Sequence, residues 1–91
     1  MEIRFEKLNF AYTRKKQVLQ DRVFTQKILP DFREPIEKVD RSDGCKVYFA
    51  DGSWVICRFS GTEPVLRLAA EGNTASQAKK YVQLWQDDLG L

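Results

Sequence analysis

The residues best suited to chemistry in this chain gather in one short segment beyond its midpoint. Ser60 and Thr62 supply hydroxyl donors, and the glycine between them lets the backbone turn sharply and approach a ligand closely. Successive amide groups in such a turn can form an anion-binding concavity. Arg58 and Arg67 flank the segment, and a guanidinium binds phosphate oxygens through two parallel hydrogen bonds. These residues form a candidate phosphate site.

An ordinary surface loop explains the same residues without any ligand. Ser-Gly-Thr is common in tight turns, and surface arginines are often simply solvated, so the residues alone leave both interpretations open. In the anion-site interpretation, Gly61 and Thr62 contribute backbone amides. Pro64 fixes the exit of the loop, and Glu63 braces the loop instead of contacting the anion.

The composition describes one small, nearly neutral domain. Apolar residues make up 43% and charged residues 31% of the 91 positions, with a net charge of +2, unlike a disordered tail or a chain that coats nucleic acid. The sequence has no histidine, the commonest general base and metal ligand. Cys45 and Cys57 lack metal-site spacing and are too few for a disulfide scaffold. Without a bilayer-spanning apolar stretch or a signal-peptide pattern, we expect a cytoplasmic location.

The elements that must position the candidate site are clearest in the second half of the chain. The Asp-Gly pair at 51–52 lies between two apolar runs, which is a strong signal for a β-hairpin and predicts two adjacent strands. A second turn sequence, at 42–44, precedes these strands. The strand candidates are Ile36 to Val39, Lys46 to Ala50, Ser53 to Arg58 and Val65 to Glu71. The candidate site therefore lies between the last two predicted strands.

A two-residue turn at the Asp-Gly pair predicts the register of this hairpin. Phe49 then lies opposite Trp54, and Cys45 and Cys57 point to opposite faces, so we expect no disulfide between them. Trp54 is expected to pack in the core, as is Trp85 on the last helix, instead of stacking on a sugar.

Helical signals lie on both sides of these strands. Residues 13–29 favour a helix that ends at Pro30, and residues 2–12 alternate enough to predict an extended segment. Thr74 and Gln77 fit a capping box, and Gly90 can end the helix that follows. We therefore expect one α+β domain, an antiparallel sheet of about four strands flanked by two helices. Residues 1–35 form its N-terminal extended segment and helix, and residues 36–91 form its sheet-and-helix core.

Three stretches of the second half resemble the last domain of the α-D-phosphohexomutases, which include phosphoglucomutase, phosphomannomutase and phosphoglucosamine mutase. The stretches are Asp43 to Phe49, Asp51 to Val55 and Arg58 to Arg67, and with the last helix the resemblance covers about half of the chain. The Arg-x-Ser-Gly-Thr-Glu-Pro run with its following arginine is the specific part. Phe59 stands where the family usually has proline.

The resemblance implies a fold similar to the TATA-binding protein and a loop that binds the substrate phosphate. Arg58, Ser60, Thr62 and Arg67 would contact the phosphate, and the amides of Gly61 and Thr62 would assist. The full enzymes are isomerases that interconvert hexose 1-phosphates and 6-phosphates, as a phosphoserine transfers phosphate through a bisphosphate intermediate. The three other domains hold that serine and a magnesium ion. We therefore expect no catalytic residue and no cofactor in this chain, and no activity from it alone.

A second hypothesis is a stand-alone interaction module that binds nucleic acid on the same sheet. The basic run Arg14-Lys15-Lys16 gives it some support, but no aromatic platform accompanies the run, which favours a solvated helix start. The resemblance favours the first hypothesis. It predicts a phosphosugar and the other three domains as partners, and neither nucleic acid nor a membrane.

Overall fold

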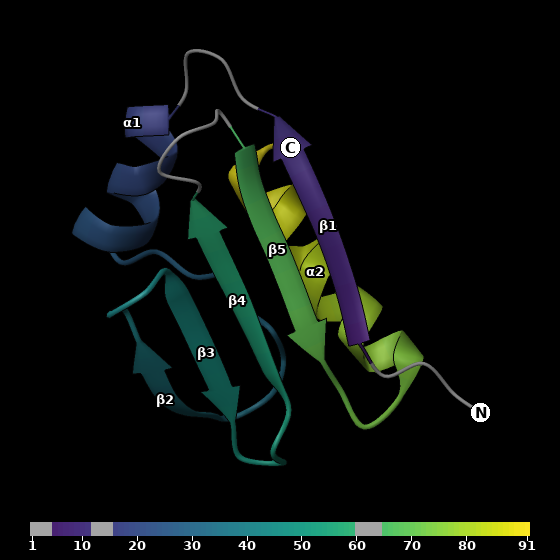
Figure 1. Cartoon of the computed structure of the whole chain (residues 1–91). Helices are drawn as coiled ribbons and strands as arrows, with labels where there is room; N and C mark the ends of the chain where they lie inside the picture. Colours follow the sequence, from purple (N-terminus) through teal and green to yellow (C-terminus); the bar gives the residue numbers. More distant parts are fainter. Residues whose placement is uncertain (1–4, 12–15, 60–64) are drawn as a thin grey trace.

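The chain forms an α+β fold with a five-stranded antiparallel sheet in the order β1-β5-β4-β3-β2 (Figure 1). The computed structural model describes residues 5–11, 16–59 and 65–91. The strands are β1 (Phe5–Ala11), β2 (Ile36–Asp40), β3 (Cys45–Phe49), β4 (Trp54–Phe59) and β5 (Val65–Glu71). The helical segments are α1 (Lys16–Gln20), the π-helical turn η1 (Asp21–Thr25) that continues it, and α2 (Ala75–Leu89). The predicted α+β class with an antiparallel sheet is confirmed.

The N-terminal extended segment supplies the strand beyond the four expected. β1 pairs with β5 along its whole length, which places β1 at one edge of the sheet and β2 at the other. α1 and η1 occupy the first part of the predicted helix 13–29 and end before Pro30. Within the described ranges, no helix is long and apolar enough to cross a membrane.

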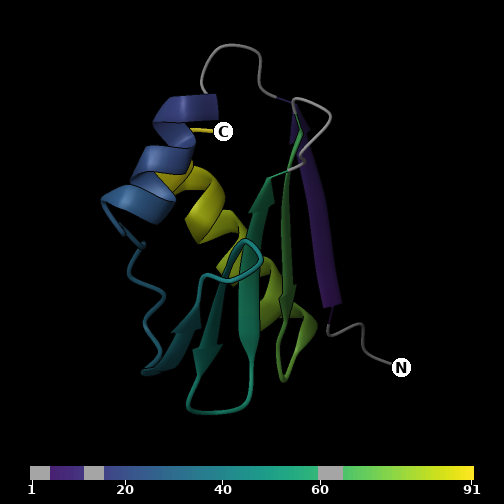
Figure 2. The same ribbon diagram turned by 60° about the vertical axis from the view of Figure 1, so that its left-hand side comes forward.

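The continuous α1–η1 segment and α2 cover the same face of the sheet, the inner face (Figure 2). Alternate residues of β3, β4 and β5 are buried against them, as the period-2 geometry of strands requires. An aromatic cluster fills the space between the layers, and the ring of Phe32 meets those of Phe49, Tyr81 and Trp85 edge to face at 5.3, 5.9 and 5.6 Å. The predicted core position of Trp85 is confirmed.

The two ends of α2 follow local capping chemistry. Thr74 Oγ1 accepts a hydrogen bond from the Gln77 amide at 3.1 Å. In a capping box the Gln77 side chain would accept a hydrogen bond from the Thr74 amide, but here it accepts one from the amide of Asn73, the preceding residue. Gly90 ends the helix in the left-handed conformation, at φ 73°. Both predicted boundaries of α2 are confirmed.

The predicted hairpin register is wrong by one residue. The loop contains three residues, 50–52, because the Phe49 amide donates to the Ser53 carbonyl at 2.9 Å and Gly52 adopts φ 90°. A three-residue loop that ends in a left-handed glycine is the next commonest hairpin connection after the two-residue turn. The extra residue shifts every cross-strand pair, so that Tyr48, and not Phe49, lies opposite Trp54.

This register changes the faces of Trp54 and Cys57 relative to β3. Cys45 and Cys57 lie directly opposite each other, both buried in the inner face, where the prediction had separated them. Both are free thiols, and burial raises the pKa of each. Trp54 lies half-buried on the outer face, the side of the sheet away from the helices, so its predicted core position is also wrong.

Candidate functional site

The β4–β5 pair places Arg58 and Arg67 directly opposite each other. The next pair toward the strand ends is Phe59 with Leu66, and Leu66 is fully buried in the inner face. Because side chains alternate along a strand, both arginines lie on the outer face, where both are exposed. The segment 60–64 joins these two strand ends, so the arginines flank it in space as they do in sequence.

The remaining predicted contacts lie outside the described residues. Ser60, Gly61 and Thr62 all belong to the connecting segment, as do Glu63 and Pro64. Their part in binding a phosphate stays a prediction.

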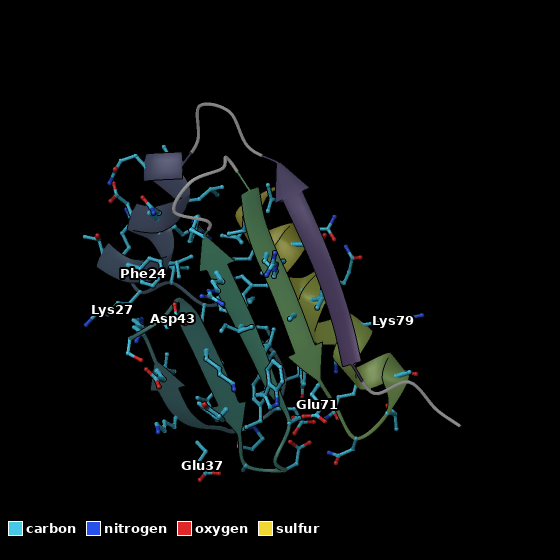
Figure 3. All side chains as sticks on the ribbon, viewed as in Figure 1. Phe24, Lys27, Glu37, Asp43, Glu71 and Lys79 are labelled. Carbon is cyan, nitrogen blue, oxygen red and sulfur yellow. The ribbon has the colours of Figure 1, made fainter. Side chains whose placement is uncertain are left out.

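The electrostatics of the arginine pair favour an anion. Like charges directly opposite each other on neighbouring strands destabilise a sheet, and a bound anion removes that cost. Asp43, in the turn before β3 (Figure 3), supplies one counter-charge. Its Oδ2 lies 3.4 Å from Nη2 of Arg58. Both side chains are largely exposed, at 53% for Arg58 and 74% for Asp43, so water screens the pair and its attraction is weak.

Phe59 anchors the end of β4 beside this pair. Its ring lies 5.9 Å from that of Phe24 in η1, tilted at 56°, and it packs against the core. The family that the sequence resembles usually has proline at this position. Here an aromatic contact with η1 holds the strand end that carries Arg58.

Lysine side chains stack on aromatic rings of the outer face at β3 and β4. The amino group of Lys46 lies 4.3 Å from the centre of the Trp54 ring and 4.9 Å from that of Tyr48. The Trp54 indole N–H donates to Glu71 at 3.0 Å. These cation–π contacts were not predicted, because the predicted register had turned Trp54 into the core.

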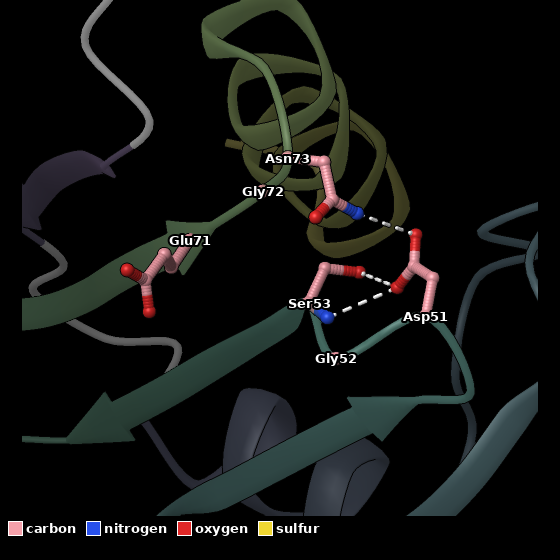
Figure 4. Close-up of a pocket in the computed structure, with 6 residues that line it drawn as sticks. All are labelled: Asp51, Gly52, Ser53, Glu71, Gly72 and Asn73. Atoms are coloured by element: carbon pink, nitrogen blue, oxygen red, sulfur yellow. Dashed lines mark hydrogen bonds between the residues drawn. The ribbon is translucent and has the colours of Figure 1, made fainter.

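A second polar cluster lies at the opposite end of β3 and β4 (Figure 4). Ser53 is buried, and its hydroxyl shares hydrogen bonds with the carboxylate of Asp51 and, at 2.9 Å, with the hydroxyl of Tyr81. Asp51 also accepts from Asn73 at 3.1 Å and from Gln77 at 2.8 Å. The hydrogen bonds from Ser53, followed by those from Gln77 and Asn73, lower the pKa of Asp51.

This cluster lines a shallow polar hollow but is built for structure. The hollow is bounded by Asp51, Gly52, Ser53, Glu71, Gly72 and Asn73. The Asp51 carboxylate already accepts from several protein donors, which join the hairpin loop to the start of α2. Throughout the part of the chain that the structure describes, no three His, Cys, Asp or Glu side chains are grouped so that they could hold a metal ion.

Comparison with known proteins gives matches to one family of enzymes. The family model for the phosphoglucomutase/phosphomannomutase C-terminal domain matches residues 8–84. A phosphoglucomutase/phosphomannomutase of Thermococcus kodakarensis is 45% identical over 47 residues, which are 52% of this chain and 10% of the relative. A probable phosphoglucosamine mutase of Methanothermobacter thermautotrophicus is 37% identical over 65 residues, 71% of this chain and 14% of the relative.

A third relative, a probable phosphoglucosamine mutase of Methanosphaera stadtmanae, is 35% identical over 69 residues, 76% of this chain and 15% of the relative. The chain thus spans only 10% to 15% of the length of these curated relatives. The family match covers most of the chain, including all of β2 to β5. The chain therefore belongs to the phosphoglucomutase/phosphomannomutase C-terminal domain family.

Proposed function

We propose that this chain is the substrate-phosphate-binding domain of a phosphohexomutase, which interconverts hexose 1-phosphates and 6-phosphates. The observation that carries the proposal is the direct pairing of Arg58 with Arg67 at the two ends of the segment 60–64. Two guanidinium groups on rigid strands can neutralise and orient a phosphate dianion through charge-assisted hydrogen bonds. The hydroxyls and amides of the segment complete the site in this proposal.

The arginines act by binding and orientation, and they do not transfer phosphate. Holding a substrate in a productive geometry is a large part of phosphoryl-transfer catalysis. In this proposal the other domains of the enzyme supply the phosphoserine and a magnesium ion, which neutralises charge on the transferred phosphate. The isolated chain is therefore inactive, and a coupled assay for conversion of glucose 1-phosphate should detect no turnover.

The binding proposal is tested by titrating the isotope-labelled chain with inorganic phosphate and with glucose 1-phosphate at low ionic strength. Backbone amide resonances of residues 58–67 should shift. Arg58→Ala and Arg67→Ala should each weaken binding roughly tenfold, as expected for losing a hydrogen bond between charged groups.

Lys79→Ala is the matched control, because it removes one exposed positive charge from α2, on the far side of the sheet (Figure 3). Its affinity for phosphate should match that of the parent chain. Binding that survives both arginine changes, or that falls equally in the lysine variant, would contradict the proposed site. A single-stranded oligonucleotide in the same titration tests the interaction-module hypothesis, which requires salt-sensitive binding.

A further inference from the structure

The turn between β2 and β3 lies against the strand that carries Arg58. Gly44 in this turn adopts φ 79°, and a Cβ there would stand 2.7 Å from the carbonyl oxygen of Cys57 and 3.3 Å from the Cα of Arg58. Only glycine permits so close an approach together with this backbone conformation. The turn is thereby held beside Arg58, and it carries Asp43 with it.

The two carboxylates of this turn have different partners. Asp40 accepts from the Ser42 amide at 2.9 Å and from the Ser42 hydroxyl at 2.7 Å, and these hydrogen bonds lower the pKa of Asp40. Asp40 therefore shapes the turn itself. Asp43 instead directs its carboxylate at the guanidinium of Arg58, at 3.4 Å.

The Asp43–Arg58 contact is suited to being exchanged. At 3.4 Å it is longer than a strong charge-assisted hydrogen bond, and both side chains face solvent. A phosphate dianion carries more charge than a carboxylate and can bind the guanidinium through two oxygens. A phosphate that approaches Arg67 and Arg58 therefore competes with Asp43 for the same group.

We propose that Asp43 is a displaceable counterion of the phosphate site. Without ligand it offsets the repulsion between Arg58 and Arg67, and it releases Arg58 when phosphate binds. Its negative charge stays close to the bound anion and weakens binding, which favours release of the phosphosugar. This inference rests on the proposed function and assigns to Asp43 a tuning role, without contact to the substrate.

The test is the affinity of Asp43→Asn for inorganic phosphate, measured by the same titration at low ionic strength. Losing one exposed negative charge beside the site should tighten binding about two- to fivefold, the range that weak surface pairs allow. In an Arg58→Ala background the same change should have little effect, because the shared partner is gone. Added salt should reduce the gain, as the charges become screened.

Asp87→Asn is the matched control, since it removes an exposed carboxylate from α2 and should leave the affinity unchanged. Unchanged or weaker phosphate binding by Asp43→Asn would overturn the counterion role. If Arg58→Ala weakens binding while Asp43→Asn does not tighten it, only this inference fails. If the parent chain binds no phosphate, or Arg58→Ala has no effect, the proposed function fails as well.

Discussion

Strand β3 has an Asp-Gly pair at each end, Asp43-Gly44 before it and Asp51-Gly52 after it. Both glycines adopt positive φ, at 79° and 90°. Apart from its chain neighbours, no atom of the described residues lies within 4 Å of the position that a Cβ of Gly52 would take, whereas a Cβ at Gly44 would meet the backbone of β4. The same dipeptide therefore makes an open loop at one end and a packed joint at the other.

The carboxylates of Asp43 and Asp51 also differ in how they are held. Asp51 is held by several protein donors and joins the hairpin loop to α2. Among the described residues, Asp43 makes a weak contact with Arg58 of the candidate phosphate site. We infer that the Asp51 turn serves stability and the Asp43 turn serves binding, with Gly44 fixing the position of the latter.

Replacing each glycine by alanine should give the largest difference between the turns. Gly52→Ala adds only the strain of a left-handed alanine, about 1 kcal/mol in the free energy of unfolding. Gly44→Ala adds the same strain and a clash with the β4 backbone, for a total of about 3 kcal/mol. Urea unfolding followed by fluorescence measures both values.

Labelling of the buried thiols measures the local effect of Gly44→Ala and Gly52→Ala on the turn before β3. Cys45 directly follows Gly44 and pairs with Cys57, so displacing the turn should expose the two thiols to a labelling reagent under native conditions. Native labelling of the parent chain should be on the order of a hundredfold slower than labelling of the unfolded chain, because burial raises the thiol pKa values. Equal destabilisation and equal labelling in the two variants would remove the distinction between the turns.

When the carboxylates are removed instead of the glycines, the Asp51 turn and not the Asp43 turn should show the larger loss of unfolding free energy. Asp51→Ala leaves the buried Ser53 hydroxyl with one partner fewer and releases Asn73 and Gln77, which should lower the free energy of unfolding by about 1–2 kcal/mol. Asp43→Ala breaks one exposed pair and should change it by less than about 0.5 kcal/mol. Thermal or urea unfolding at neutral pH compares them, and a larger loss in Asp43→Ala would contradict the assignment.

The smallest expected effect is the loss of the stability that Asp51 contributes as the pH is lowered. The folded chain holds the pKa of Asp51 below its ordinary value, so the folded state binds fewer protons than the unfolded state as pH falls through this range. The stability contributed by Asp51 is complete above the unfolded pKa of about 4 and is lost as pH falls through the folded value.

Unfolding measured between pH 7 and pH 3 should therefore show a shallower pH dependence in Asp51→Ala than in the parent chain. Gly52→Ala is the control, because it weakens the same loop and keeps the carboxylate. An Asp51→Ala profile that runs parallel to the parent profile would show that the network does not depend on the charge of Asp51.

Local chemistry determined the ends of α2 and the position of the turn before β3. The Thr74 cap, the Gly90 terminator and the turn at 42–44 could all be predicted, because each acts within a few residues. The arginines that flank the segment 60–64 could be found for the same reason, since antiparallel strands joined by a short connection must bring their ends together.

Tertiary structure decided what these elements face. One extra loop residue, allowed by the left-handed Gly52, set the hairpin register, and with it the faces of Trp54 and Cys57 relative to β3. The pairing of β1 with β5 and the contact of Asp43 with Arg58 join segments whose meeting depends on packing across the sheet. An Asp-Gly pair predicts a turn from its backbone preferences alone, but only the neighbouring strand determines whether that turn stays open or packs against it.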